Sequence, residues 1–153
     1  MSLRVIDDSN RAAVEALRVG PDQSRFVDGV RSSIEEAATY EKPPWYRAIY
    51  SGDVPVGFVM LADDDPTFRW RYYLWRLLID ARHQGRGFGR AALDHVVAYV
   101  RTRPGGDELV TSVAGPEDEA SPLAFYLRYG FVNTGEMYDH ELLLRLDLRV
   151  GSA

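Results

Sequence analysis

The sequence predicts a single domain of the mixed α/β class (α/β in the broad sense that includes α+β), in which helices flank a central sheet. Three observations support this prediction. The chain has 153 residues, which is about the size of one domain. Segments with the apolar period of a helix alternate with segments that have the character of strands. Paired strand segments near both ends of residues 1–153 indicate hairpins, and these predict a mixed sheet.

The composition excludes several classes of protein. The chain has no Cys, which rules out structural disulfides, thiolate nucleophiles and Cys-based zinc sites. The net charge of -5 argues against a nucleic-acid partner. No apolar run approaches the roughly 18 residues of a membrane span, and residues 1–8 lack the apolar stretch of a signal peptide. We therefore expect a cytoplasmic protein without a membrane partner.

The N-terminal part of the chain is predicted to form a short strand and two helices. Residues 3–6 form the strand, and residues 7–10 offer N-cap candidates for a helix that ends near Leu17. The opposite face of the second helix is charged, which fits either a solvated face or the lining of a site for a cationic ligand. This second helix, over residues 23–38, places its apolar side chains on one stripe, namely Phe26, Val27, Val30, Ile34 and Ala37.

Three strands are expected in the middle of the chain. Residues 46–50 alternate in polarity and end at the turn 51–53, so that residues 54–61 complete an antiparallel hairpin. Residues 72–79 form a strongly apolar and aromatic run, which is typical of a central strand that is buried on both faces.

The C-terminal half is predicted to alternate helix and strand before it ends in a last pair of strands. The expected elements are a helix over residues 87–101, a strand over 109–113, a short helix over 122–129 that stops at Gly130, and strands over 131–138 and 140–148.

The strongest chemical signal lies between the buried strand and the helix at residues 87–101. Residues 82–90 (Arg-His-Gln-Gly-Arg-Gly-Phe-Gly-Arg) hold three glycines and three arginines. A helix N-terminus presents about four unpaired backbone N–H groups and roughly half a positive charge. Glycines let a phosphate approach those groups, and arginines add bidentate donors. The segment therefore predicts a pyrophosphate site; glycines that only form the turn are the plainer alternative.

Two other phosphate-binding motifs fit this segment poorly. A P-loop needs Gly-Lys followed by Ser or Thr, and the segment has no such sequence. A Rossmann fingerprint can be placed on Gly87, Gly89 and Ala92, but Gly87 lies eight residues past Ile79, where the strand ends. The acidic residues about 20 positions further on also precede the next strand instead of ending it. A nicotinamide cofactor is therefore weakly supported.

Two segments resemble a known family. Residues 84–89 (Gln-Gly-Arg-Gly-Phe-Gly) look like the Gln/Arg-x-x-Gly-x-Gly/Ala signature of the GNAT superfamily of acyl-CoA-dependent N-acetyltransferases. Residues 125–131 (Phe-Tyr-Leu-Arg-Tyr-Gly-Phe) resemble the family's Leu-Tyr-x-Lys-x-Gly-Phe segment. The resemblance is specific over residues 72–131 and implies a mostly antiparallel sheet. Within the superfamily, the chain looks most like bacterial spermine/spermidine (diamine) acetyltransferases in three short runs, at residues 73–77, 121–122 and 134–136.

The resemblance implies acetyl-CoA as the co-substrate and assigns residues to it. Main-chain groups of Leu77, Leu78 and Ile79 would pair with the pantetheine arm, because in this fold the central strand splays from its neighbour. The same stretch of backbone would supply an oxyanion donor. The other residues expected to bind the coenzyme are Gln84, Gly85, Arg86, Gly87, Phe88, Gly89, Arg90 and Ser121.

The resemblance also implies a catalytic tyrosine but leaves the base open. Tyr126 matches the family tyrosine beside the sulfur, so we expect it to protonate the departing thiolate; a core aromatic is its alternative role. Many relatives place a Glu on the central strand, where this chain has residues 75–78, and Glu119 or Ser121 falls near the family's Asn. A water chain to Glu136, or to an acid on the second helix, remains a candidate base.

A polyamine is a polycation, so a site for it should present carboxylates and aromatic faces. The residues expected to bind the acceptor are Glu35, Glu36, Trp75 and Glu136, and Trp45, Tyr72 and Asp139 are further candidates. Amino acids, aminoglycosides and a protein N-terminus are alternative acceptors. A CoA-binding sensor without catalytic activity is an alternative of another class.

The expected partner is a small-molecule amine, and no metal is expected. His83, His95 and His140 are scattered along the chain without the spacing of a zinc site. Relatives of this type are often dimers through sheet edges or C-terminal strands, so the resemblance admits a homodimer.

Overall fold

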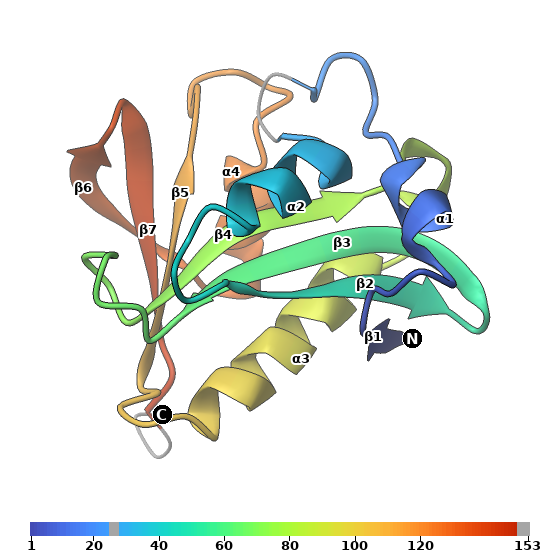
Figure 1. Cartoon of the computed structure of the whole chain (residues 1–153). Helices are drawn as coiled ribbons and strands as arrows, with labels where there is room; N and C mark the ends of the chain where they lie inside the picture. Colours follow the sequence, from blue (N-terminus) through green and yellow to red (C-terminus); the bar gives the residue numbers. More distant parts are fainter. Residues whose placement is uncertain (25–27, 150–153) are drawn as a thin grey trace.

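The structure, a computed structural model, describes residues 1–24 and 28–149. These residues form a seven-stranded sheet in the order β1-β2-β3-β4-β5-β7-β6 (Figure 1). Neighbouring strands are antiparallel except for β4 and β5, which confirms a mixed and mostly antiparallel sheet. The strands are β1 (Ser2–Arg4), β2 (Trp45–Ser51), β3 (Val54–Asp63), β4 (Tyr72–Ile79), β5 (Glu108–Val113), β6 (Val132–Tyr138) and β7 (Glu141–Asp147).

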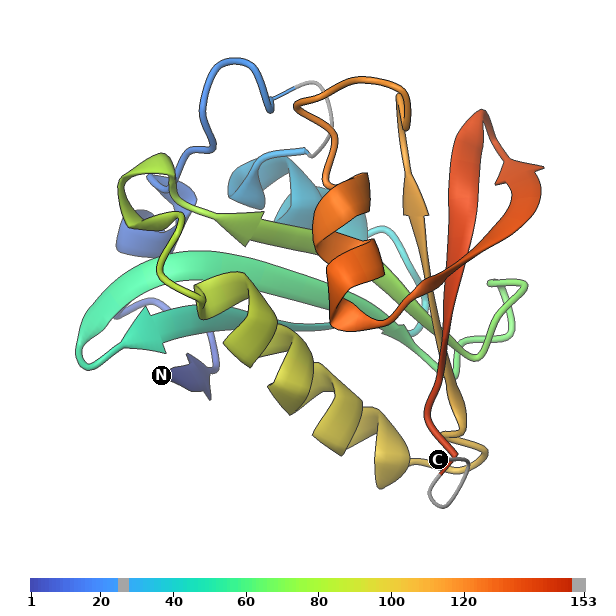
Figure 2. The ribbon, with the colours of Figure 1, turned by 180° about the vertical axis from the view of Figure 1, so that it is seen from behind.

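Helices cover both faces of the sheet. On one face lie α1 (Arg11–Glu15) and α2 (Val30–Ala37), and on the other lie α3 (Phe88–Arg101) and α4 (Leu123–Tyr129) (Figures 1 and 2). A 3₁₀ turn (Ala81–His83) links β4 to the segment that leads into α3. The sheet is therefore the middle layer of three.

Two apolar clusters hold the layers together. Alternate residues of a strand point to opposite faces of a sheet. Ala48 of β2 and Phe58 of β3 accordingly pack toward α1 and α2, whereas Ile49 and Val59 pack toward α3. The side chains that α3 buries lie on one stripe, and they are Ala92, Leu93, Val96, Val97 and Val100.

The central strands β4 and β5 are parallel and pair over two residues each. Tyr73 and Leu74 of β4 pair with Val110 and Thr111 of β5, and the described part of the chain forms no further pair between these strands. Residues 76–79 of β4 pair only with β3, on the other side of the strand, among the described residues. The sheet is therefore split beyond Leu74, with an open edge along β4.

A β-bulge at Trp75 marks the start of this open edge. The residues on either side of Trp75 pair with the successive β3 residues Leu61 and Met60, so Trp75 itself has no partner in β3. Bulges bend a strand and increase its twist. Because of the split, the predicted burial on both faces holds for the first part of β4, whereas residues 75–77 are half-buried.

The helix predicted over residues 23–38 is too long at its start. The described helix begins at Val30, after Gly29 in an extended conformation, and residues 21–24 form turns. The Gly29 carbonyl accepts hydrogen bonds from the backbone N–H and the hydroxyl of Ser33, at 3.0 and 2.7 Å. Gly29 therefore starts the helix as its N-cap. Phe26 and Val27, expected on the apolar stripe, lie outside the described residues.

Other predicted boundaries agree more closely with the structure. The run over residues 72–79 is confirmed as β4, and α3 begins one residue later than expected, at Phe88. The first strand is shorter than predicted and ends at Arg4, where its pairing with β2 ends. The helix expected to reach Leu17 ends at Glu15.

Asp80, at the end of β4, is hydrogen-bonded to the segment that follows α1. Its side chain is almost fully buried. The carboxylate accepts hydrogen bonds from the backbone N–H of Arg18 at 2.9 Å and from the backbone N–H and Nε of Arg82 at 3.1 and 2.9 Å. Burial alone would raise the pKa of Asp80, but these hydrogen bonds and the charge of Arg82 lower it below its ordinary value. The ionised carboxylate therefore stabilises the start of the glycine-rich segment.

We predict that Asp80→Asn lowers the free energy of unfolding by about 2 kcal/mol at neutral pH, because an amide cannot accept all three hydrogen bonds. The pKa of Asp80 is lower in the folded than in the unfolded chain. Its contribution is therefore full above the unfolded value, near 3.9, and is lost as the pH falls through the folded value. The gap between the two proteins should close below about pH 4, as measured by urea unfolding across pH.

Asp53→Asn is the matched control for this prediction. The Asp53 side chain is 97% exposed and pairs with Arg4 at the surface, so its removal should leave stability unchanged. A loss for Asp80→Asn that is constant from neutral to acidic pH would show that the charge of the carboxylate is not responsible.

Candidate functional site

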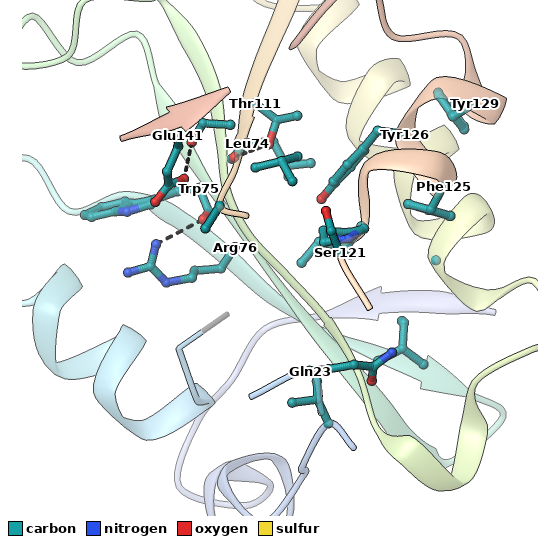
Figure 3. A pocket seen from close by; sticks show the side chains of 18 of the residues that line it. Gln23, Leu74, Trp75, Arg76, Thr111, Ser121, Phe125, Tyr126, Tyr129 and Glu141 are labelled. Carbon is teal, nitrogen blue, oxygen red and sulfur yellow. Dashed lines mark hydrogen bonds between the residues drawn. The ribbon is translucent and has the colours of Figure 1, made fainter. Parts of the chain in front are cut away.

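A cavity of about 1220 Å³ lies where β4 and β5 diverge. Its walls come from β4, β5, the glycine-rich segment, α4, α2 with the chain that precedes it, and the start of β7 (Figure 3). Leu74 and Thr111, the last pair that joins the two strands, lie at the centre of this view. Tyr126 and Ser121 lie on one side of them, and Trp75, Arg76 and Glu141 on the other. The cavity therefore has two halves that meet where the strands part.

The first half is formed by the glycine-rich segment and the N-terminus of α3. Gly85 and Gly87 have φ angles of +76° and +81°, a conformation that side chains disfavour. A Cβ at either position would meet no atom within 4 Å. Gly87 is the N-cap of α3 and no side chain caps this end, which leaves the N–H groups of its first turn free for a ligand. The predicted anion site thus has both the open space and the donors that it needs.

Other residues of this segment have supporting positions. The Gln84 amide donates to the Ile79 carbonyl at 3.0 Å and to Gln23 Oε1 at 2.8 Å, so this side chain ties the segment to its neighbours. Gly89 faces Phe125, whose ring lies 3.1 Å from where a Cβ would be. Arg90 lines the cavity.

The remaining side chains of the segment differ in their access to the cavity. Phe88 lines it, whereas Arg86 is exposed and is not among the described lining residues. His83 also lines it, and its Nδ1 is buried with no hydrogen-bond partner within the described ranges. Such an orphaned polar atom is costly unless a ligand satisfies it.

The open edge of β4 forms the floor between the halves. The carbonyl oxygen of Leu78 lies against Gly57 of β3. Because backbone groups of successive strand residues point to opposite sides, the polar groups of Leu77 and Ile79 face the open edge. Leu77 and Ile79 line the cavity, while the Leu78 side chain packs into the cluster beneath α2. Unpaired strand groups of this kind accept an extended ligand as an added strand.

Tyr126 is held at the junction of the two halves. It lies on α4 with 6% of its surface exposed, and its hydroxyl is hydrogen-bonded to the Thr111 side chain. The Thr111 hydroxyl donates to the Leu74 carbonyl at 2.9 Å, so it accepts the hydrogen of Tyr126. Burial raises the pKa of Tyr126 above its ordinary value of 10.0, although the bond to Thr111 acts in the opposite direction. Tyr126 is thus a protonated hydrogen-bond donor at neutral pH.

Ser121 helps to position the helix that carries Tyr126. Its hydroxyl accepts a hydrogen bond from the Leu123 backbone N–H at 3.2 Å, at the start of α4, and the residue lines the cavity. The helix ends at Gly130, the predicted stop, whose φ angle is +128°.

The second half of the cavity is lined by aromatic rings that pack edge to face or stacked on one another. Tyr40 and Phe68 have ring centroids 5.7 Å apart, and both contact Trp75, at 5.2 and 5.1 Å. Trp70 lies 4.9 Å from Tyr138 of β6. Residues 68–75 contain five aromatic residues, and this density is the signal in the sequence that could have revealed the aromatic wall.

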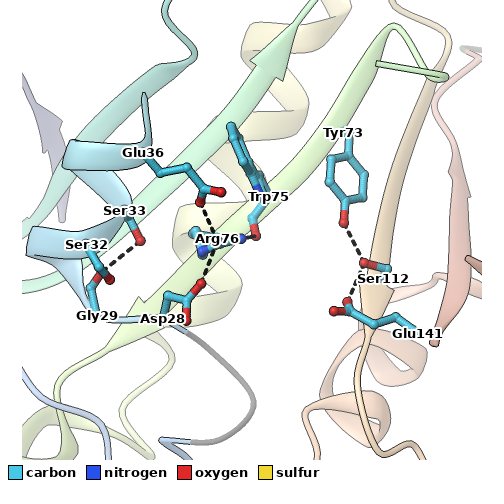
Figure 4. A network of polar contacts seen from close by, with 10 residues as sticks. All are labelled: Asp28, Gly29, Ser32, Ser33, Glu36, Tyr73, Trp75, Arg76, Ser112 and Glu141. Carbon is cyan, nitrogen blue, oxygen red and sulfur yellow. Dashed lines mark hydrogen bonds and ion pairs between the residues drawn. The ribbon is translucent and has the colours of Figure 1, made fainter. Parts of the chain in front are cut away.

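Carboxylates share this half with one arginine. The Arg76 guanidinium donates to Asp28 Oδ2 at 2.7 Å and to Glu36 Oε1 at 2.9 Å (Figure 4). Two carboxylates thus surround one cation, and Glu119, Asp139 and Glu141 also line the cavity. The excess of negative charge favours a cationic ligand.

The structure brings together two of the four residues expected to bind the acceptor. Glu36 and Trp75 line the cavity. Glu35 faces away from the cavity and pairs with Arg31 at 3.1 Å, and Glu136 pairs with Arg69 at 2.7 Å. Neither of them is among the described residues that line the cavity. Of the further candidates, Asp139 lines the cavity, whereas Trp45 and Tyr72 do not.

Two features are absent from the described residues. They contain no group of three or more His, Asp or Glu residues that could hold a metal ion. None of their helices is long and apolar enough to cross a membrane.

The sheet splays between two parallel central strands, and an uncapped helix N-terminus lies at the split, as the resemblance to the N-acetyltransferases implies. The chain belongs to the acetyltransferase (GNAT) family, whose model matches residues 15–131. A similar protein is the spermine/spermidine N(1)-acetyltransferase of Bacillus subtilis (strain 168), which is 28% identical over 143 residues that cover 90% of this chain and 91% of the relative.

Solved structures share the fold. An acetyltransferase from Thermus thermophilus has a TM-score of 0.72 at 18% identity, over 95% of this chain and 96% of the other. A GNAT family acetyltransferase from Elizabethkingia anophelis with acetyl-CoA bound has a TM-score of 0.59 at 15% identity, over 79% of this chain and 85% of the other.

We predict that Thr111→Val lowers stability by about 2 kcal/mol, because Tyr126 and the Leu74 carbonyl then lose their buried hydroxyl partner. Thr111 is 2% exposed, so water cannot replace that hydroxyl easily. Thr111→Ser keeps the hydroxyl and should lose less stability than Thr111→Val. Urea unfolding of both variants measures the difference, and a valine variant as stable as the serine variant would contradict the bridge between Tyr126 and β4.

Proposed function

We propose that the chain transfers the acetyl group of acetyl-CoA directly to a primary amine of a small cationic acceptor, such as a polyamine. The observation that carries this proposal is the cavity at the split between β4 and β5, with anion-binding features in one half and carboxylates and aromatic rings in the other. The name of the Bacillus subtilis relative supports a polyamine, and the Elizabethkingia anophelis structure supports acetyl-CoA.

The coenzyme fits the first half of the cavity. Its pyrophosphate would lie at the N-terminus of α3, among the backbone N–H groups of residues 85–89 and beside Arg90. The orphaned Nδ1 of His83 offers another polar contact in this half. The pantetheine arm would extend along the open edge of β4 and pair with the backbone of Leu77 and Ile79. Gln84 holds the segment in place through Ile79.

The chemistry takes place where the halves meet. The nitrogen lone pair of the acceptor attacks the thioester carbonyl carbon, and a backbone N–H of residues 75–79 stabilises the oxygen that becomes negative. When the C–S bond breaks, the Tyr126 hydroxyl turns its one hydrogen from Thr111 to the departing thiolate. Because the pKa of Tyr126 is raised, this donation stabilises the thiolate, whose proton comes from the amine.

The acceptor fits the second half. The aromatic wall of Tyr40, Phe68 and Trp75 can hold the methylene groups of an alkyl amine and interact with its positive charge. Glu36, Asp139 and Glu141 supply negative charge around it. One domain would therefore bind both substrates in one cleft, and the net charge of -5 would favour the approach of a cation.

Other functions make different predictions. Amino acids, aminoglycosides and protein N-termini are also amines, and they would use the same chemistry with another acceptor. A sensor would bind CoA without turnover. A nicotinamide-dependent oxidoreductase would bind NAD instead.

We predict that acetyl-CoA and CoA raise the melting temperature and that NAD does not. A ligand at 100 times its dissociation constant adds about 2.7 kcal/mol of stability, which is readily measured. In a thiol-release assay with a panel of amines, spermine and spermidine should be the acceptors that reach saturation at the lowest concentration.

The outcomes separate the candidate functions. Stabilisation by CoA without turnover of any amine would support the sensor, and stabilisation by NAD alone would overturn the proposal. Saturation by amino acids, aminoglycosides or peptides alone would exclude the polyamine while keeping the acetyltransferase.

We predict that Tyr126→Phe lowers kcat at least about tenfold and leaves the Kd of CoA nearly unchanged, because the hydroxyl acts on the thiolate and not on bound coenzyme. Steady-state kinetics with the best acceptor and calorimetry with CoA measure the two effects. Tyr46→Phe, on the far side of β3, is the control for loss of a hydroxyl. An unchanged kcat would remove Tyr126 from the mechanism.

A further inference from the structure

Three side chains from three strands form a hydrogen-bonded chain in the acceptor half of the cavity. The Tyr73 hydroxyl on β4 lies 2.5 Å from the Ser112 hydroxyl on β5, and this hydroxyl lies 2.7 Å from Glu141 Oε1 at the start of β7 (Figure 4). All three residues line the cavity. The function proposed above gives Tyr73 and Ser112 no role, uses Glu141 only as negative charge near the acceptor, and still needs a base.

The number of hydrogens on each oxygen fixes which group donates in the Tyr73–Ser112–Glu141 hydrogen bonds. An ionised carboxylate has no hydrogen to donate, so the Ser112 hydroxyl donates its only hydrogen to Glu141. Tyr73 must then be the donor to Ser112, which leaves a lone pair of the Tyr73 oxygen free to accept a hydrogen bond from a ligand. Every hydrogen in the chain points toward Glu141. A proton that enters at Tyr73 can therefore be passed along without rearranging the contacts.

The hydrogen-bonded side chains of Tyr73, Ser112 and Glu141 lie across the split from Tyr126. Thr111 points toward Tyr126, and Ser112, the next residue of β5, points to the opposite face of the sheet. Figure 3 places Tyr126 and Glu141 on opposite sides of Leu74 and Thr111. A thioester between the diverging strands would have Tyr126 on the side of its sulfur. An acceptor amine would reach it from the side of Tyr73.

The other acids that line the acceptor half are engaged or exposed. Asp28 and Glu36 share the Arg76 guanidinium, so both carboxylates are held by a cation that compensates one of their two negative charges. Glu119 and Asp139 are exposed to solvent. Glu141 is half-buried and, within the described ranges, is bonded to a hydroxyl and to no cation. It is therefore the acid best placed to gain a proton.

We propose that Glu141 is the base of the acetyl transfer and receives the proton of the acceptor ammonium through Tyr73 and Ser112. This inference rests on the proposed function. An N–H bond of the ammonium breaks and its proton binds the Tyr73 oxygen, while the Tyr73 proton moves to Ser112 and the Ser112 proton to Glu141. The freed lone pair then forms the C–N bond. The second proton lost by the nitrogen ends on the thiolate, and Glu141 returns its proton to solvent.

The charged and titratable groups that face the chain fit this role. Burial raises the pKa of Tyr73, the bond to Ser112 lowers it, and the negative charge of Glu141 raises it. Tyr73 therefore stays protonated and passes on a proton only as it gains one. Arg76 on β4 and Tyr138 on β6 also act on Tyr73, in opposite directions. Asp139, in the turn before β7, is a further charged residue that lines the cavity.

The test compares the Glu141→Gln and Tyr73→Phe variants with the unaltered protein. Spermidine is the acceptor and acetyl-CoA is the donor. Glutamine keeps an oxygen that can accept from Ser112 but cannot take a proton. Each variant should lower kcat/KM about 100-fold near neutral pH. The loss for Glu141→Gln should shrink toward about pH 10, where free amine is abundant and needs no base. The double variant should lose no more than either single variant, because the residues act as one unit.

Glu108→Gln is the matched control. Glu108 lies on β5 with Ser112, but it pairs with Arg145 at the surface and is not a lining residue of the described cavity. Its kcat/KM should equal that of the unaltered protein. Thermal melting of each variant then confirms that a lost rate is not lost folding.

The possible failures can be told apart. If the unaltered protein and Glu108→Gln turn over and Glu141→Gln does so at the same rate with the same pH profile, the relay is overturned and the proposed function stands. The relay is also overturned if the losses of kcat/KM in the double variant are additive, or if the loss for Glu141→Gln is constant with pH. If the unaltered protein acetylates no amine in the panel, both proposals fail together.

Discussion

The pairing between β4 and β5 ends after Leu74 and Thr111, and the site depends on this single interruption. A continuous sheet would satisfy the backbone of both strands and leave no cavity between them. The bulge at Trp75 bends β4 away, so polar groups near Leu77 and Ile79 lose a strand partner. Backbone groups without a strand partner need a side chain, a ligand or water as a hydrogen-bond partner. The open edge is tolerated because Asp80 and the β3 pairing hold β4 in place from its other side.

The split also separates two kinds of charge. The uncapped N-terminus of α3 makes one half of the cavity favourable for anions, while Asp28, Glu36 and Glu141 make the other half favourable for cations. A coenzyme with phosphates and an acceptor with ammonium groups would therefore enter opposite halves. Their reacting ends would meet between the strands, where Tyr126 and the Tyr73–Ser112–Glu141 chain approach from opposite faces. Tyr126 and the proposed base Glu141 stay apart because successive residues of β5, Thr111 and Ser112, point to opposite faces.

The features that could be predicted from the sequence are those that depend on neighbouring residues. The apolar run over residues 72–79 identified β4, and glycines at 85 and 87 identified a segment whose conformation needs them. Only part of the aromatic wall could be derived in this way, because Tyr40 and Tyr138 come from segments far from residues 68–75 in the sequence. The expected roles of Glu35 and Glu136 differ from their observed positions, because each is drawn to an arginine outside the cavity. Charge pattern alone does not identify those pairings.

The sequence by itself determined the order of helices and strands, the mixed sheet, the place of the glycine-rich segment before α3 and the resemblance that singles out Tyr126. These follow from local periodicity and short motifs, which act over a few residues. Only the tertiary structure decided which carboxylates are free. Asp28 and Glu36 both pair with Arg76, whereas Glu141 meets Ser112 and Tyr73 across three strands. Strand pairing brings together residues that lie far apart in the sequence, and hydrogen-bond geometry then decides which of them can move a proton.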